Sequence, residues 1–321
     1  MPGGERPTSA LPTIRVGIVE KNQHTFWDGE NAGWREAAAR LGMEVAVAAP
    51  VQENIDEQLA MMRRHLADGV DVLGFVGTYP DAFDEVVAEA ADRGVPCICF
   101  DLDAPRSGRK LYVGMKDPYT MGRWAGERML ALLPPGPRLI GLQTGSEKAA
   151  GARGKLDGFV DVMKENGHSV VGGANDGEDV ALSRRNCEQL LAEHPDVDAL
   201  YGVYSYHTAI QGQCVRSLAR KPVVFGWDVL PETIELLQEG IVDTAVWIKE
   251  YYFGYYAATA VATLVRVGVD EALEVMGMDP VHLEGNVICP EAEAITPQTV
   301  DRYVRWRRDH GLEDKLTRLA S

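Results

Sequence analysis

The chain has 321 residues, of which 45% are hydrophobic and 25% are charged, a composition typical of soluble globular proteins. At roughly 100–200 residues per domain, this length predicts two domains. With 48 acidic and 32 basic side chains the formal net charge is −16, which argues against a nucleic acid or an anionic membrane as a partner, because both require a basic surface.

Up to Asp101 the chain alternates short β-rich runs with amphipathic segments. Apolar residues at helical spacing, such as Ile55, Leu59 and Met62, indicate helices, and glycines such as Gly69 end them. Strands are predicted over residues 13–19, 43–49, 70–76 and 95–100, and helices over 28–41, 55–67 and 82–93. This alternation indicates parallel βαβ units with right-handed crossovers.

After a turn-rich link over 103–108 and a short strand over 111–114, the alternation restarts. Strands are predicted over 138–143, 169–172, 197–203, 222–226 and 242–248, and helices over 119–133, 154–166, 182–193, 208–219, 231–238 and 251–267. Two such runs predict an α/β fold of two doubly wound parallel-sheet lobes. A basic amphipathic stretch from Thr296 is interpreted as a solvated C-terminal helix, with a partner-docking helix as the alternative.

The motifs of several enzyme classes are absent from the sequence. It contains no G-x-G-x-x-G, no phosphate-binding loop, no G-x-S-x-G and no H-E-x-x-H. Its seven histidines are scattered, and its five cysteines show no zinc-type spacing, so neither a metal nor a cofactor is expected. Cys97 and Cys99 alternate with apolar residues, which indicates one buried face of a strand.

Targeting signals are also missing. Residues 1–11 are rich in proline and glycine and lack the apolar region of a signal peptide, so either the protein is cytoplasmic or a leader has been removed. The most apolar helical segment, 251–267, is short and contains Arg266. We therefore interpret it as a buried helix rather than a membrane span.

Candidate binding residues follow the predicted strands, where open α/β sheets bind their ligands. Phe26 and Trp27 follow the first strand and could cover the face of a sugar ring, or pack under the first helix. Asp101, Asp103 and Asp228 also follow strands. A carboxylate there can accept hydrogen bonds from two hydroxyl groups, or it can simply form a turn.

A cation and several phenols complete this set. Lys155 opens a helix and could reach a hydroxyl or acid group of a ligand, or be solvated. Tyr204 begins a Tyr-Ser-Tyr-His run after another strand. Rings, acids, phenols and a lysine suit a polyhydroxylated ligand, although the carboxylates by themselves leave a glycosidase open.

In order and spacing, blocks of the chain resemble the type I periplasmic (solute-binding) proteins of sugar ABC transporters, the ribose-binding-protein-like group. The resemblance runs from about Thr13 to Tyr303 and includes VGIVEKNQHTFWDGENAGWREAAARLG, RGVPCICFDLDAP and VVFGWDVLPETIELLQEGIVDTAV. It implies two lobes joined by a three-crossing hinge. The lobes would be 12–113 plus 249–281 and 114–248 plus 282–295, with a helical extension over 296–321.

The resemblance implies binding roles for residues that match the family's ligand-binding positions. These are His24, Phe26, Trp27, Asp101, Lys155, Tyr204 and Asp228, and we add Asp103 from its place after a strand. Lys155 stands where the family has an arginine and Tyr204 where it has an asparagine. Leu102 and Ile248 replace a further arginine and a glutamine, so we expect another sugar, a polyol or a modified sugar rather than ribose.

The resemblance further implies a monomeric, non-enzymatic carrier outside the cytoplasm, which closes over a small carbohydrate and delivers it to a membrane permease. One alternative is the effector core of a lactose-repressor-type regulator, but that would need a DNA-binding segment of roughly 60 residues before the first strand. About twelve residues precede Thr13. A sugar-sensing receptor and a glycosidase using Asp101 and Asp228 are further alternatives.

Overall fold

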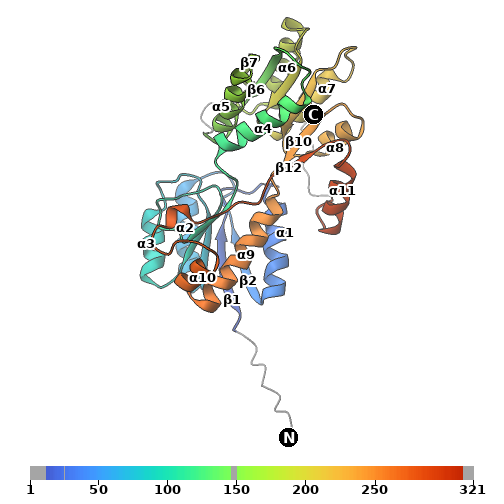
Figure 1. Ribbon diagram of the computed structural model, residues 1–321. Helices are drawn as coiled ribbons and strands as arrows, with labels where there is room; N and C mark the ends of the chain where they lie inside the picture. Colours follow the sequence, from blue (N-terminus) through green and yellow to red (C-terminus); the bar gives the residue numbers. More distant parts are fainter. Residues whose placement is uncertain (1–11, 25, 146–149, 314–321) are drawn as a thin grey trace. The chain divides into compact units, whose positions relative to one another are not determined.

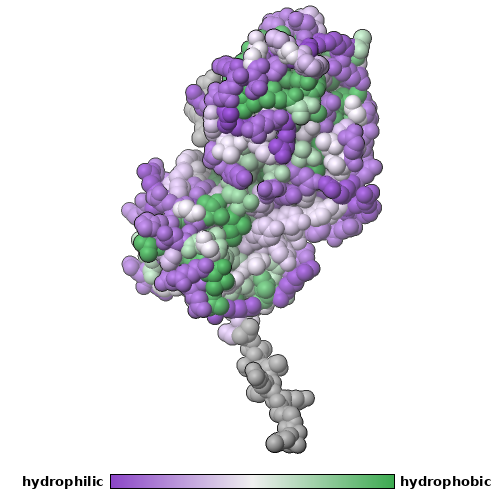
Figure 2. Space-filling view, viewed as in Figure 1, coloured by the Kyte–Doolittle hydropathy of each residue, from purple (hydrophilic) through white to green (hydrophobic). Residues whose placement is uncertain are grey.

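The computed structural model describes residues 12–24, 26–145 and 150–313 (Figure 1). The chain forms two compact units, each composed of two stretches of sequence. The first unit takes in the chain up to Gly114 together with Glu250–Pro290. The second takes in Met115–Lys249 together with the chain from Glu291. On the face seen in Figure 2 hydrophilic residues predominate, as expected for a chain with the composition of a soluble globular protein.

The first unit contains a parallel sheet with the strand order β11-β5-β4-β3-β1-β2. Its strands are β1 (Ile14–Val19), β2 (Met43–Ala48), β3 (Val72–Val76), β4 (Cys97–Asp101), β5 (Leu111–Gly114) and β11 (Val287–Ile288). Its helices are α1 (Trp27–Leu41), α2 (Ile55–Ala67), α3 (Asp84–Asp92), α9 (Glu250–Val267), α10 (Val269–Val275) and the 3-10 turn η1 (Leu283–Gly285).

Each face of this sheet has its own hydrophobic core. Successive strand residues point to opposite faces, so Val72 packs with α1 and α9 while Leu73 packs with α2 and α3. Helices on both faces explain why β3 and β4 are buried along their whole length. Cys97 and Cys99 are buried and free, which confirms their predicted place in the core.

The second unit contains a sheet with the order β12-β10-β9-β8-β6-β7, parallel except for β12. Its strands are β6 (Leu139–Thr144), β7 (Ser169–Asn175), β8 (Ala199–Gly202), β9 (Val223–Trp227), β10 (Thr244–Trp247) and β12 (Glu293–Ile295). Its helices are α4 (Pro118–Leu132), α5 (Ala150–Glu165), α6 (Val180–Glu193), α7 (Ser205–Val215), α8 (Pro231–Gln238) and α11 (Val300–Asp309).

The two sheets share one winding order. The run β2-β1-β3-β4-β5 in the first unit has the same order as β7-β6-β8-β9-β10 in the second, the arrangement of a doubly wound α/β fold. The predicted fold class is therefore confirmed. It also follows that β4 and β9 occupy equivalent positions in their sheets.

Two predicted details differ from the structure. Residues 282–290 were assigned to the second lobe, but β11 pairs with β5 and so extends the first sheet. The pairing covers the open edge of β5, where Tyr112 N donates to Asn286 O at 2.9 Å.

The C-terminal stretch was interpreted as a solvated extension. Instead, α11 packs one face on the second unit, with the Trp247 ring between Tyr303 (centroids 5.1 Å apart) and Trp306 (4.5 Å). The predicted buried helix over 251–267 corresponds to α9, half of whose residues are buried. In the part of the chain that the structure describes, no helix combines the length and apolarity needed to span a bilayer.

Glycines bring pairs of helices into close contact in both units. In the first, a Cβ atom at Gly33 would lie 2.0 Å from Tyr251 O, and one at Gly254 would lie 2.1 Å from Glu30 O. The second unit repeats this arrangement. A Cβ atom at Gly122 or at Gly158 would lie 2.1 Å from a carbonyl oxygen of the facing helix. Figure 1 shows α1 beside α9 and α4 beside α5, as these contacts require. The backbones therefore touch, and the helix positions are fixed closely.

We predict that Gly33→Ala destabilises the protein, because its methyl group would force α1 away from the backbone of α9. The expected loss in the free energy of unfolding is about 1–3 kcal/mol, even though alanine favours the helix itself. Urea denaturation measures it. Gly285→Ala is the control, since a Cβ atom there meets nothing within 4 Å. Equal stability of the two variants would contradict the close contact.

Candidate functional site

Two predicted acids occupy equivalent places in the two units. Asp101 ends β4 and Asp228 follows β9, and both have φ 58°. Non-glycine residues rarely adopt this left-handed conformation, although aspartate tolerates it better than most, and such strain is often found at functional sites. Each therefore projects from the carboxyl edge of its own sheet, the edge at which open α/β sheets bind ligands.

The aromatic residues after β1 divide into a buried and an accessible one. The Trp27 side chain is only 2% exposed, packs in the core under α1, and donates from Nε1 to Asn22 Oδ1 at 3.2 Å. Phe26 is half-buried and meets the Trp27 ring edge-on, with the centroids 4.9 Å apart. Exposed His24 accepts the Phe26 backbone N–H at Nδ1 and so orders this turn. Phe26 is thus the ring of the two that retains accessible surface.

Asp103 has a structural partner. Its two carboxylate oxygens accept hydrogen bonds from Arg109 Nε (2.5 Å) and Nη2 (2.7 Å). Arg109 is fully buried and also donates to the backbone carbonyls of Leu283, Glu284 and Asn286. This ion pair holds the segment around η1 against the first sheet. Both carboxylate oxygens of Asp103 therefore have a partner within the protein, so a ligand is not needed to explain its position.

Sequence reasoning missed a group of buried polar side chains in the first unit. Glu20 directly follows β1 and is 5% exposed, and burial raises its pKa to about 7 against the opposing effect of a 2.6 Å hydrogen bond from Asn31 Nδ2. Glu30 on α1 is 1% exposed, and burial together with the charge of Asp101 raises its pKa well above the usual range. The first unit therefore carries several desolvated acids near Asp101.

One sequence signal could have identified Glu30. It lies on the same helical stripe as Trp27, Trp34 and Ala37, all of which are buried. A charged residue on an apolar stripe is either buried at a cost in free energy or paired with another group. In both cases it is a candidate functional residue.

In the second unit the structure brings Lys155 and Asp228 within electrostatic reach of each other. Lys155 Nζ donates to the backbone oxygen of Val203 at 3.1 Å and lies 4.4 Å from the centroid of the Trp227 ring. Burial raises the pKa of Asp228, and the positive charge of Lys155 opposes that rise. Predicted residues from α5 and from the end of β9 thus share one environment.

Tyr204 lies in a polar network that sequence reasoning found only in part. Its ring stacks on Tyr206 with the centroids 5.5 Å apart, and its hydroxyl donates to Glu178 Oε1 at 3.1 Å. Asp176, which follows β7, accepts from the Tyr206 hydroxyl at 2.9 Å and meets His207 Nε2 at 2.8 Å. The network ties together the loops that follow β7 and β8.

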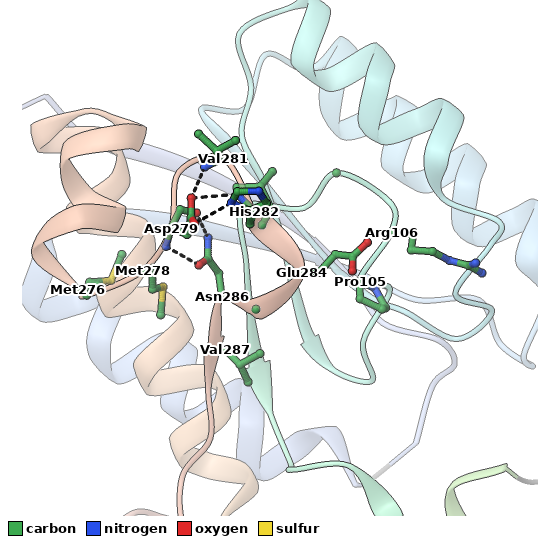
Figure 3. Close-up of a pocket in the computed structure, with 14 residues that line it drawn as sticks. Pro105, Arg106, Met276, Met278, Asp279, Val281, His282, Glu284, Asn286 and Val287 are labelled. Carbon is green, nitrogen blue, oxygen red and sulfur yellow. Dashed lines mark hydrogen bonds and ion pairs between the residues drawn. The ribbon is translucent and has the colours of Figure 1, made fainter.

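A groove of about 940 Å³ lies elsewhere on the first unit, between the 105–108 turn and the segment from α10 to β11 (Figure 3). Its polar groups bind one another. Asp279 Oδ1 accepts the backbone N–H groups of Val281 and His282, and Asn286 bonds to the backbone of Asp279 in both directions. None of the predicted binding residues lines it. We therefore place the candidate site at the strand ends.

The strand ends of both units offer charged and polar groups beside aromatic rings. The first unit offers acids and an aromatic face, and the second offers a cation, an acid and phenols. Within residues 12–24, 26–145 and 150–313, no three or more His, Cys, Asp or Glu side chains are grouped to hold a metal ion.

Comparison with known proteins agrees with this geometry. The family described as "Periplasmic binding protein domain" matches residues 16–268. The xylose/arabinose-binding protein XylF of Sulfolobus acidocaldarius is 24% identical over 62% of this chain and 53% of its own length, so the chain spans about half of that relative. A D-ribose/D-allose-binding protein of Pseudomonas aeruginosa is 24% identical over 91% of this chain and 89% of its own.

Solved structures show the same fold. GanP, a glucose-galactose binding protein from Geobacillus stearothermophilus, is 27% identical with a TM-score of 0.71, covering 90% of this chain and 99% of its own. The sugar-binding protein of a Bacillus halodurans sugar ABC transporter is 21% identical with a TM-score of 0.77, covering 91% and 99%. The predicted resemblance is confirmed. Because the family match extends over most of the chain, this protein belongs to the periplasmic binding protein domain family.

Proposed function

We propose that the protein is the substrate-binding component of a carbohydrate ABC transporter. A small sugar, polyol or modified sugar binds between its lobes, which close over it by hinge bending. The observation that carries this proposal is the pair Asp101 and Asp228, two carboxylates in the same strained conformation at equivalent strand ends. Charged acceptors of this kind form strong hydrogen bonds with hydroxyl groups.

In this proposal each remaining residue has a defined task. Phe26 covers the apolar face of the sugar ring, and His24 and Trp27 hold it in place. Lys155 donates to ligand oxygens, and Tyr204, whose hydroxyl proton goes to Glu178, accepts from a ligand hydroxyl group. We leave Asp103 out of the ligand set, because Arg109 already occupies both of its oxygens.

The relatives support a carrier rather than an enzyme, since the proteins compared above are named for binding xylose, arabinose, ribose, allose, glucose or galactose. A carrier of this type works as a monomer outside the cytoplasm and presents its closed form to the membrane permease. The ligand shifts the protein toward that closed form by binding it more tightly than the open form.

A thermal-shift screen against pentoses, hexoses and polyols tests the proposal. A ligand that binds only the folded state raises stability by about 2.7 kcal/mol at a concentration one hundred times its Kd. We expect at least one carbohydrate to raise the Tm and to be recovered chemically unchanged after prolonged incubation. Turnover of the compound, or no shift with any of them, would contradict the proposal.

Replacing either equivalent acid should weaken binding without unfolding the protein. Asp101→Ala and Asp228→Ala each remove a charge-assisted hydrogen bond, at a cost of about 1.5–3 kcal/mol or a tenfold or larger increase in Kd. Calorimetry with the sugar found by the screen measures this. Asp81→Ala, which removes a carboxylate that is 76% exposed, serves as the control. Unchanged affinity in both site variants would refute their assignment.

Asp103→Ala should lower stability rather than sugar affinity, because it leaves the fully buried Arg109 without its carboxylate partner. Removing one member of such a pair is expected to lower the free energy of unfolding by about 3 kcal/mol. Sugar affinity, measured below the melting transition, should stay at the level of the unsubstituted protein. A loss of affinity at full stability would return Asp103 to the ligand set.

A further inference from the structure

Glu30 is a buried acid without a hydrogen-bond partner. It lies in α1 with 1% of its surface exposed, and neither carboxylate oxygen has a partner among the described residues. Taking an unpaired carboxylate out of water costs several kcal/mol, so buried carboxylates normally have a cation or several donors. The close contact of α1 with α9 at Gly254, against the Glu30 carbonyl oxygen, prevents the helix from turning this side chain to solvent.

The groups around Glu30 are acids as well. The charged groups that act on it most strongly are Asp101, Glu20 and Glu250, in that order. Glu250 reaches the start of α1, where its Cγ would lie 2.7 Å from a Cβ atom at Gly29. Asn31 donates to Glu20, and its Oδ1 is a further buried acceptor with no partner in the described part of the chain. Glu30 and Asn31 therefore leave three buried acceptor oxygens without a partner among the described residues.

The charged groups that act most strongly on Glu30 include no basic side chain. Arg35 is exposed, and it contributes to the electrostatics of Glu20. Lys21 pairs with Glu53 at 3.6 Å. Unpartnered buried acceptors beside other carboxyl groups are complementary to a group that only donates and carries positive charge, because that group favours the ionised form of the acids. An ammonium group has three donors and no acceptor, whereas a hydroxyl group has one donor and stays neutral.

We propose, on the basis of the function proposed above, that the ligand is an amino sugar or an aminocyclitol whose protonated amino group binds at Glu30, Asp101 and Glu20. Asp101 is shared by the two proposals, since it lies at the strand end and is the charged neighbour that acts most strongly on Glu30. The amino group neutralises the acids, and the hydroxyl groups of the same ligand use the remaining strand-end residues. In the unliganded protein the buried, unpartnered Glu30 reduces stability, a frequent property of binding sites.

The first test compares ligands that differ only at nitrogen. The probes are D-glucosamine, D-glucose and N-acetyl-D-glucosamine, the corresponding galacto and manno series, and an aminocyclitol with its parent inositol, all measured by calorimetry. We expect at least one amine to bind about tenfold or more tightly than both of its neutral counterparts, as charge-assisted hydrogen bonds predict. Tighter binding of the neutral members would overturn this inference and leave the proposed function intact. Absence of binding throughout this panel, with a carbohydrate found by the thermal-shift screen, would likewise overturn the inference alone, and absence of binding in both experiments would contradict both proposals.

The second test replaces Glu30 by its neutral isostere. Glu30→Gln should weaken binding of the amine about tenfold or more while binding of its neutral counterpart is retained, because only the charge is lost. The Tm of the unliganded variant should rise, since a buried unpaired acid has been removed. Glu85→Gln removes the same charge from a side chain that is 91% exposed and should change neither property. A lower Tm with unchanged amine affinity would show that Glu30 is structural and would overturn the inference.

Discussion

The binding edge of the first unit depends on the contact between α1 and α9. Gly33 and Gly254 let the two backbones touch, and this contact fixes the start of α1, from which Phe26, Trp27 and Glu30 project. A looser helix pair would let Glu30 reach water, and the hydrated carboxylate would then need no partner within the site. The second unit uses the same device at Gly122 and Gly158, and there it fixes the helix that carries Lys155. In both units, the close approach of two helices fixes the position of the charged side chains that lie near the strand ends.

The two-lobed fold could be predicted because its signal is local and repeated. Parallel strands buried on both faces appear in the sequence as short apolar runs. The helices between them have apolar residues every three or four positions and end at a glycine. β11 could not be found in this way, since a strand of two residues has no recognisable pattern and exists only because β5 offers it an open edge. The burial of one face of α11 depends likewise on Trp247, a residue far from it in sequence.

Candidate site residues can be predicted from the sequence where their position depends on topology, but not where it depends on packing. Asp101 and Asp228 could be proposed because the carboxyl ends of parallel strands form the ligand edge. Asp103 satisfies the same rule, but its partner Arg109 is apparent only in three dimensions. Glu30 stands on the apolar stripe of α1, which is visible in the sequence, but its acidic neighbours Asp101 and Glu20 are apparent only in three dimensions. Residue type and position thus identify candidates, and packing decides among them.

The position of α9 late in the sequence has a consequence for biosynthesis. The first unit begins near the N-terminus but is completed by Glu250–Pro290, so the part of the apolar stripe of α1 that packs on α9 has no cover while the intervening residues are being made. At about 5–20 residues per second, the ribosome leaves that stripe open for many seconds, a period in which exposed hydrophobic surface favours aggregation. The nascent chain therefore exposes this part of α1 until α9 has been made, whatever the stability of the finished molecule.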